Sequence, residues 1–288
     1  MQGTVDGFSY GLVTPLVAYL MACLGGALGL RCTTRALLVA HSWRPGWLAL
    51  GSAAIGSGIW TMHFVAMMGF TVEGAPIHYD KPTTYASLGV AIVMVGIGIF
   101  IVGYRGATGT ALFTGGTITG LGIASMHYLG MAGMRLNGKL EYNTLTVAAS
   151  VVIAMVAATA ALWAAGQVRG FLWSVGASLV MGLAVSGMHY SGMAALSVHL
   201  HNTGTASAGD SPAALLAPML VGPLAFLCLA GVVVMFDPLM VMGKPDWTPV
   251  EHKPGVPAHA SVPHSARRAP LRTRRKAGSR ESRAPQNR

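Results

Sequence analysis

Three near-copies of one short motif hold the side chains of this chain that are best suited to chemistry. The segments Met62–Met67, Met126–Met131 and Met188–Met193 share the pattern Met-His-aromatic-x-x-Met and begin 64 and then 62 residues apart. Such a regular period indicates an internal structural repeat. Residues four positions apart share one face of a helix, so each copy offers an imidazole and a thioether on one stripe. These two donors favour a soft or borderline metal ion, above all copper, over Ca²⁺ or Mg²⁺.

The histidine and both methionines of every copy are the predicted metal ligands: Met62, His63, Met67, Met126, His127, Met131, Met188, His189 and Met193. Three tyrosines lie at the starts of other apolar runs, at Tyr10, Tyr79 and Tyr142. Their hydroxyl groups could orient the imidazole rings by hydrogen bonds. Anchoring of aromatic rings at the membrane interface explains these tyrosines equally well.

Each of these features also has a purely structural explanation. A single buried histidine is often bonded to a backbone carbonyl or a tyrosine hydroxyl, and methionine is a common filler of apolar cores. The glycines Gly56, Gly120 and Gly182, one before each motif, are typical of closely packed membrane helices. Packing alone therefore remains an alternative to ligand binding.

The composition indicates a polytopic membrane protein. Of 288 residues 53% are hydrophobic and only 10% are charged, against about 25% charged in a typical soluble domain. Seven runs have about the ~20 residues that a membrane-spanning helix needs, and they lack the alternation of a barrel strand. They cover residues 10–30, 47–70, 84–104, 111–134, 144–166, 171–195 and 214–236.

We therefore predict an all-α membrane protein with seven transmembrane helices, built as three helix-pair repeats plus one helix. The expected divisions are a short extracytoplasmic N-terminus (1–8), the membrane domain (9–240) and a disordered, basic, Pro-rich tail (241–288). Three parallel pairs would place His63, His127 and His189 at equal height around a pseudo-threefold axis. None of the predicted spans contains Asp, Glu, Lys or Arg, and ionisable residues at membrane depth usually mark function.

The distribution of Lys and Arg predicts the orientation. Sixteen of the 19 lie in the tail or in the loops after the first, third and fifth spans, at Arg31, Arg35, Arg44, Arg105 and Arg169. By the positive-inside rule the N-terminus is outside and the C-terminus is cytoplasmic. The motifs then lie in the outer leaflet. We expect the tail to bind anionic inner-leaflet lipid, and we expect no nucleic-acid partner.

Other sequence features limit the function. No cleavable signal peptide is expected, because the residues before the first span include no Lys or Arg. Cys23, Cys32 and Cys228 are scattered and form no CxxC motif. No nucleophile–base pair, paired carboxylates or phosphate loop is visible, so we expect no catalytic centre.

The motifs, together with Ile59-Trp60-Thr61 before the first copy and Tyr79-Asp80 after it, resemble the MHYT domain. This family is an integral membrane sensor module of bacteria, and the resemblance covers about residues 8–240. It implies that motif Met, His and Tyr residues bind copper and sense O₂, CO, NO or redox state. The family pattern adds Tyr128 and Tyr190 as supporting residues, but the first copy has Phe64 at this position.

Many MHYT proteins continue into a diguanylate cyclase, phosphodiesterase or histidine kinase domain, which this sequence does not show. We therefore expect a signalling partner in trans or a role for the tail. The favoured function is a copper-dependent membrane sensor in the bacterial cytoplasmic membrane. The alternatives are a haem protein, a transporter of metal or small solutes, and a structural membrane protein without a ligand.

Overall fold

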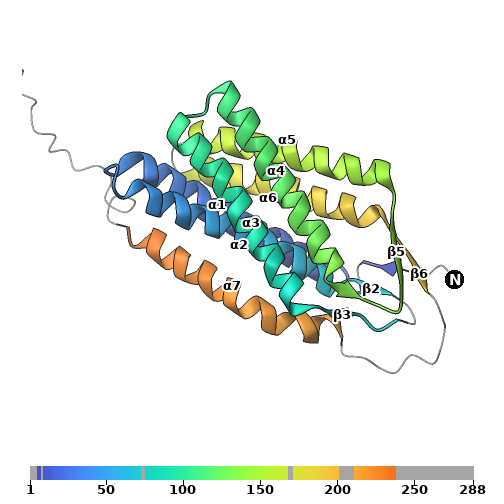
Figure 1. The fold of residues 1–288 in the computed structure, drawn as a ribbon. Helices are drawn as coiled ribbons and strands as arrows, with labels where there is room; N and C mark the ends of the chain where they lie inside the picture. The colour runs from blue at the N-terminus through green and yellow to red at the C-terminus, as the bar shows by residue number, and fades with distance from the viewer. Residues whose placement is uncertain (1–4, 8, 73–74, 168–170, 201–210, 238–288) are drawn as a thin grey trace, which may run out of the picture. The chain divides into compact units, whose positions relative to one another are not determined.

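Seven helices make up most of the computed structural model, which describes residues 5–7, 9–72, 75–167, 171–200 and 211–237. The predicted tail and Arg169 thus lie outside the described residues. The helices are α1 (Val13–Leu38), α2 (Arg44–Met68), α3 (Lys81–Arg105), α4 (Gly109–Ala132), α5 (Thr144–Gln167), α6 (Phe171–Ala194) and α7 (Pro212–Met235) (Figure 1). Within the described residues, six of them are long and apolar enough to cross a bilayer. The remaining one, α4, is rich in Gly and Thr, and its span stays a prediction.

The first helix is longer than the sequence predicts. It runs to Leu38 instead of ending near residue 30, so Arg31 and Arg35 lie on its last turns and not in a loop. Likewise, Arg44 is the first residue of α2 and Arg105 the last of α3. No Pro or Gly interrupts the segment after Gly29, and the long arginine side chains can carry their charge to the membrane surface from within a helix.

The first six helices form a closed ring in chain order. Each of α1 to α5 packs against the next helix, and α6 packs against α1. The even helices α2, α4 and α6 also contact one another across the ring, whereas α7 packs mainly against α2. This is the arrangement of three helix pairs plus one helix that the repeat predicts.

Short antiparallel strands connect the helices at one end of the bundle, a feature that the sequence did not predict. The pairs are β1 (Val5–Asp6) with β2 (Thr71–Val72), β3 (His78–Tyr79) with β4 (Met134–Arg135), and β5 (Gly138–Tyr142) with β6 (Leu196–Leu200). Each pair joins the segment before an odd helix to the segment after the following even helix, which satisfies their backbone groups. We call this the strand end and the opposite end, with Arg31, Arg35, Arg44 and Arg105, the arginine end.

Three equivalent hydrogen bonds define how the repeats align. The backbone nitrogens of Ser9, Asp80 and Asn143 donate to carbonyl oxygens that directly follow α2, α4 and α6, at 3.0, 2.8 and 2.8 Å. Tyr79 and Tyr142 directly precede two of these donors, Asp80 and Asn143. The position that precedes Ser9 is 8, which lies outside the described residues. Tyr10 lies further along the chain and is therefore not equivalent to these two tyrosines.

Glycines seven residues before each histidine bring the even helices close to the next odd helix. A Cβ added to Gly56 would lie 2.8 Å from Cα of Ile92 in α3. Gly120 meets the backbone of Met155 in α5 in the same way, and Gly182 meets Cys23 in α1. The expected role of these glycines in close helix packing is thus confirmed.

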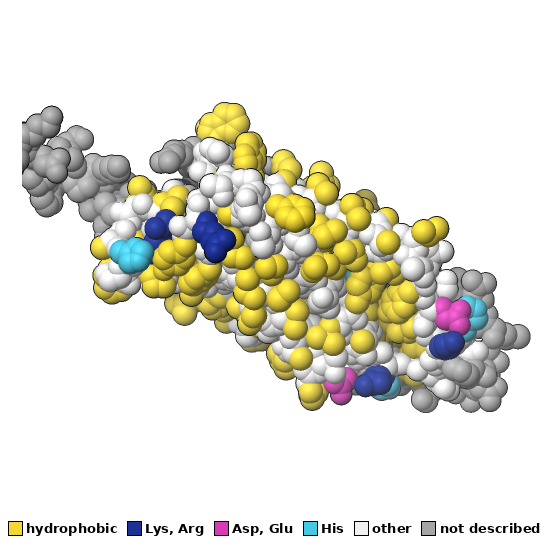
Figure 2. Space-filling model, turned by 45° about the horizontal axis from the view of Figure 1, so that its top comes forward, with side chains coloured by type: hydrophobic (Ala, Val, Ile, Leu, Met, Phe, Trp, Pro, Cys, Tyr) yellow, Lys and Arg dark blue, Asp and Glu magenta, His cyan; other side chains and the backbone are white. Residues whose placement is uncertain are grey.

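The surface of the bundle suits a lipid environment. Figure 2 shows charged side chains at the two ends of the visible face and hydrophobic or uncharged groups between them. Large apolar side chains are exposed along the helices, among them Leu145, Leu172 and Phe113. A soluble protein rarely exposes so continuous an apolar area, and the chain is accordingly a multi-pass membrane protein.

Candidate metal centre

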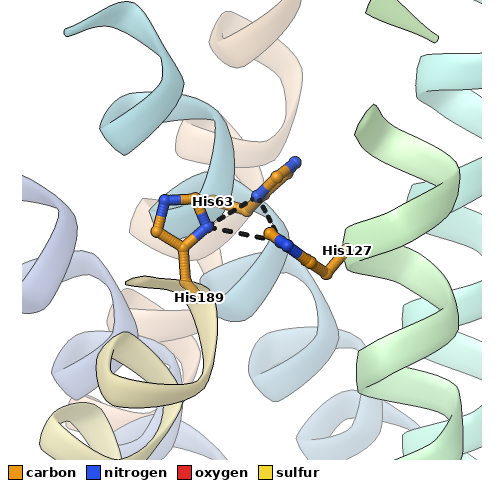
Figure 3. Close-up of side chains that lie close together, drawn as sticks. All are labelled: His63, His127 and His189. Carbon is orange, nitrogen blue, oxygen red and sulfur yellow. Dashed lines mark hydrogen bonds between the residues drawn. The ribbon is translucent and has the colours of Figure 1, made fainter. Parts of the chain in front are cut away.

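The three motif histidines meet at the centre of the helix ring. His63 of α2, His127 of α4 and His189 of α6 are 1%, 1% and 2% exposed. Their Nδ1 atoms form a triangle with sides of 3.0 Å (His63 to His189), 3.2 Å (His127 to His63) and 3.4 Å (His189 to His127) (Figure 3). The predicted meeting of three equivalent histidines is therefore present in the structure.

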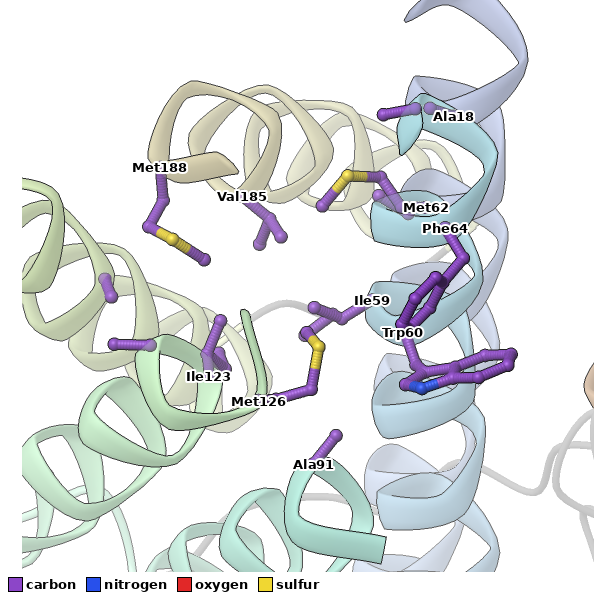
Figure 4. Packing of buried hydrophobic residues seen from close by; sticks show 14 of the residues in the cluster. Ala18, Ile59, Trp60, Met62, Phe64, Ala91, Ile123, Met126, Val185 and Met188 are labelled. Atoms are coloured by element: carbon purple, nitrogen blue, oxygen red, sulfur yellow. The ribbon is translucent and has the colours of Figure 1, made fainter. Parts of the chain in front are cut away.

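The repeat itself explains why the histidines lie at one height. Each histidine is five residues before the last residue of its helix, at the strand end. One turn earlier on the same face stands an aliphatic residue, at Ile59, Ile123 or Val185, and all three are buried. Figure 4 shows these residues facing the same interior space. Three similar helices in similar positions thus place similar side chains in successive layers.

Three neutral imidazoles cannot satisfy this contact by hydrogen bonds alone. Each Nδ1 carries either one proton or one lone pair in the ring plane. Among three mutually close nitrogens at least one pair must therefore place proton against proton or lone pair against lone pair. A cation at the centre removes the conflict because it accepts all three lone pairs.

The size of the triangle fits a metal ion. A point equidistant from the three Nδ1 atoms lies about 1.9 Å from each, close to the ~2.0–2.1 Å of a zinc–imidazole bond. His63, His127 and His189 are the one cluster of three or more His, Cys, Asp or Glu side chains that is close enough to hold an ion among the described residues. Imidazole donors suit copper and zinc alike.

Glycines of the neighbouring motifs hold two of the rings in place. Nε2 of His63 and Nε2 of His127 are buried and have no hydrogen-bond partner among the residues that the structure describes. Gly130 packs directly on the ring of His63, and Gly192 packs on that of His127. Metal-bound histidines usually donate this second N–H to an oxygen, so here packing replaces that hydrogen bond. Sequence reasoning recognised the small residues but had no signal for the rings they contact.

The motif methionines line the packed interior around the cluster. Met62, Met126 and Met188 are at most 1% exposed, and Figure 4 shows them in the packed interior with Ile59, Ile123 and Val185. Met67 and Met131 are also buried, and Met193 is partly buried. The structure thus brings the three histidines into direct contact, while a ligand role for the methionines stays a prediction.

Tyr79 and Tyr142 contact the aromatic residues of the motifs. Tyr142 lies edge-on to Tyr128 with ring centroids 5.8 Å apart, and Tyr79 lies edge-on to Phe64 at 6.4 Å. Burial raises the pKa of the Tyr79 and Tyr142 hydroxyl groups, so both stay neutral. Tyr10 is 48% exposed. The hydrogen bonds described for the three motif histidines join them to one another.

The first motif has Phe64 where the second has Tyr128, and each repeat fits its own residue by local hydrogen bonds. The hydroxyl group of Tyr128 is hydrogen-bonded to Oγ of Ser150 at 2.7 Å. In the first copy the equivalent serine, Ser87, instead accepts a hydrogen bond from Nε1 of Trp60 at 3.0 Å. Both serines are thus satisfied, which explains how the first copy can lack the phenol. The ring of Tyr190 lies 4.9 Å from that of His189.

Fold and site together define a class: a multi-pass helical membrane protein with three helix pairs around a buried histidine cluster. The MHYT family model, described as "Bacterial signalling protein N terminal repeat", matches residues 56–115 and 120–178. Residues 56–178 of the chain therefore carry MHYT repeats. The third motif lies beyond the matched residues, but its histidine completes the cluster.

Curated relatives are signalling proteins. The bifunctional diguanylate cyclase/cyclic di-GMP phosphodiesterase MucR of Pseudomonas aeruginosa is 35% identical over 235 residues, which are 80% of this chain and 34% of the relative. The cyclic di-GMP phosphodiesterase NbdA of the same organism is 35% identical over 208 residues, 68% of this chain and 26% of the relative. The signaling protein YkoW of Bacillus subtilis is 29% identical over 198 residues, 66% of this chain and 24% of the relative.

The chain spans about a third or less of the length of these relatives. The similarity thus concerns the MHYT region and not the whole of those proteins. No solved structure matches the chain.

Proposed function

We propose that the protein is a membrane sensor whose histidine cluster binds copper and responds to a diatomic gas or to redox state. The observation that carries the proposal is the triangle of Nδ1 atoms, whose sides of 3.0, 3.2 and 3.4 Å suit three lone pairs directed at one ion. The ion would supply a redox-active centre that can take a further small ligand. His63, His127 and His189 would hold it, with the motif methionines as additional soft donors.

Copper suits the surroundings of the cluster better than the hard cations do. The site is enclosed by apolar side chains and methionines, and it offers no carboxylate among the described residues. Ca²⁺ and Mg²⁺ need oxygen ligands, whereas imidazole and thioether favour copper. The relatives' names, which concern signalling, support a sensory role for the shared region.

The geometry also bears on the alternative functions. A haem with two histidine ligands needs imidazoles on opposite faces of a macrocycle, and no macrocycle fits between nitrogens 3.0–3.4 Å apart. On the arginine side of the cluster lies a cavity of about 40 Å³ with a mostly aliphatic lining, which includes Ile59, Ile123 and Val185. Such a lining offers a transported ion few ligands on that side. A purely structural cluster would leave the conflict among the ring nitrogens unresolved.

We further propose that the strand end faces outward. Four of the five described arginines lie at the other end, where Asp237 is the acidic partner of Arg35. Arg135 lies at the strand end, together with Lys81 and Lys139. By the positive-inside rule the arginine end is cytoplasmic. The cluster then lies near the outer surface, and a change there must reach the cytoplasm through the helices, by way of a partner protein or the tail.

Metal analysis tests this proposal. The wild type, purified in mild detergent and supplied with Cu(I), is compared with a variant in which His63, His127 and His189 are all replaced by Ala. A control variant carries Ala at three exposed histidines, His41, His78 and His199. We expect stoichiometric copper in the wild type and control and its loss in the cluster variant, with helix content by circular dichroism unchanged. Copper in the cluster variant, or none in the wild type, would contradict a metal centre here.

A further inference from the structure

The threefold arrangement around the cluster is broken at one of its three junctions. Two junctions are closed by glycine: Gly130 covers Nε2 of His63, and Gly192 covers Nε2 of His127. The third junction lies between α2 and α6, where the motif position of these glycines is occupied by Ala66. The neighbouring histidine there is His189.

The methyl group of Ala66 keeps this junction more open than the other two. A Cβ added to Gly130 would lie 2.6 Å from Nε2 of His63, and one at Gly192 would also overlap the ring of His127. Ala66 already carries its Cβ, so it cannot approach a histidine ring as closely as the two glycines do. The third junction is therefore less tightly closed than the other two.

A cavity of about 310 Å³ occupies this place. Since Nδ1 of His189 faces the other two rings, its Nε2 points away from the cluster. Two motif thioethers, of Met67 and Met193, line the same cavity. The lining among the described residues is Gly7, Ala66, Met67, Phe70, His189, Tyr190, Met193 and Ala194.

We infer that soft monovalent cations reach the histidine cluster through this cavity, where Met67, Met193 and His189 are the first ligands they meet. This inference rests on the proposed metal centre and adds the route by which the centre is filled. Thioether and imidazole bind Cu(I) and Ag(I) and do not suit Ca²⁺ or Mg²⁺. The mostly aliphatic space on the arginine side of the cluster offers no comparable set.

The first experiment tests the opening without any metal. Diethyl pyrocarbonate is a small neutral reagent that transfers an ethoxycarbonyl group to an accessible imidazole nitrogen, and mass spectrometry locates the product. In the detergent-purified wild type we expect His189 to react before His63 and His127. In Ala66→Leu, whose larger side chain occupies the cavity, the reaction of His189 should slow about tenfold.

A matched control separates the opening from a general effect on folding. Ala132→Leu places the same side chain at an exposed position of α4, one residue beyond Met131, and should leave the order and rate of labelling unchanged. Equal reactivity of all three histidines, or an unchanged rate for His189 in Ala66→Leu, would overturn the inference.

The second experiment measures how fast Ag(I) is taken up. Met67→Leu should slow uptake about tenfold. The control is Met219→Leu, at a methionine of α7 outside the three motifs, and should leave the rate unchanged. Met67 and Met219 are both buried, at 1% and 4% exposed, so the two variants are matched in packing. Equal rates in the two variants would contradict the route. A wild type that binds no Ag(I) refutes the metal centre itself, while the labelling order still decides whether the cluster opens at His189.

Discussion

The unit that builds the candidate site is an imidazole from one motif together with a glycine from the next. His63 rests against Gly130 and His127 against Gly192. These contacts hold rings whose second nitrogen has no hydrogen-bond partner in the described part of the chain. A change of one carbon at either glycine should therefore disturb the cluster more than its size suggests.

Gly192→Ala tests this contact. The added Cβ must displace the ring of His127, so we expect a loss of about 1–3 kcal/mol in stability, as for overpacked cores, and weaker metal binding. Thermal unfolding in detergent and copper content measure the two effects. The matched control is Gly187→Ala on the same helix, where a Cβ meets nothing within 4 Å and should be neutral. Equal behaviour of the two variants would show that glycine does not hold the ring.

The elements repeat a common plan, and α3 and α5 begin with equivalent side-chain caps. Asp80 caps α3 by accepting a hydrogen bond from the backbone nitrogen of Thr83 at 2.9 Å, and Asn143 accepts the equivalent bond from Thr146 at 3.1 Å. Such caps satisfy amide groups that the first turn of a helix leaves without partners. The caps also fix where the odd helices begin relative to the even ones.

The cap of α3 should make stability depend on pH. Hydrogen bonds from the side chain and backbone of Thr83 hold the pKa of Asp80 below its usual value. Because the folded-state pKa is the lower one, the cap stabilises the fold above the ordinary carboxyl range and loses this effect as the pH falls through the folded-state pKa.

Asp80→Asn isolates that contribution, since asparagine keeps an accepting oxygen and does not titrate. We expect the melting temperature of the wild type to fall more steeply than that of the variant between about pH 5 and pH 2. Asp80→Ala should lower the melting temperature at neutral pH as well. Parallel curves for the wild type and Asp80→Asn would show that the carboxylate has no such role.

At the scale of the whole molecule, one ion pair fixes the end of the seventh helix. Nε of Arg35 on α1 lies 2.7 Å from Oδ2 of Asp237, just after α7, and the two side chains are 12% and 6% exposed. Because α7 lies outside the ring of six helices, this pair connects it to the repeats at the arginine end.

Asp237→Ala should destabilise the protein by about 3 kcal/mol, because it leaves the charge of Arg35 buried without this partner. The double exchange Arg35→Asp with Asp237→Arg should recover part of the loss. For comparison, Glu141→Ala removes the exposed partner of Lys139 and should cost less than about 1 kcal/mol. Thermal unfolding in detergent gives all three stability changes, and similar losses for Asp237→Ala and Glu141→Ala would argue against the coupling.

The proposed orientation can be tested in intact cells. His78 lies at the strand end and His41 at the arginine end, and both are exposed. A maleimide that does not cross membranes should label His78→Cys and not His41→Cys, with the wild type as the background from Cys23, Cys32 and Cys228. The opposite result would place the cluster near the cytoplasmic surface.

The sequence by itself determined the membrane class, the helix positions and the threefold repeat. Long apolar runs leave few alternatives to helices in lipid, and the period of Met62–Met67 and its two copies implies equivalent positions. The contact of His63, His127 and His189 follows from that symmetry. Helix ends were less predictable: Arg31 and Arg35 belong to α1 because nothing in the sequence stops a helix there.

Only the tertiary structure decided what lies beside each motif residue. Distances between helices decide three features of the site. They are the layer of Ile59, Ile123 and Val185, the contacts of histidine rings with glycines of other repeats, and the opening at His189. Those distances are set by side chains on both partners at once. One methyl group at Ala66 therefore distinguishes three junctions that the repeat alone would make alike.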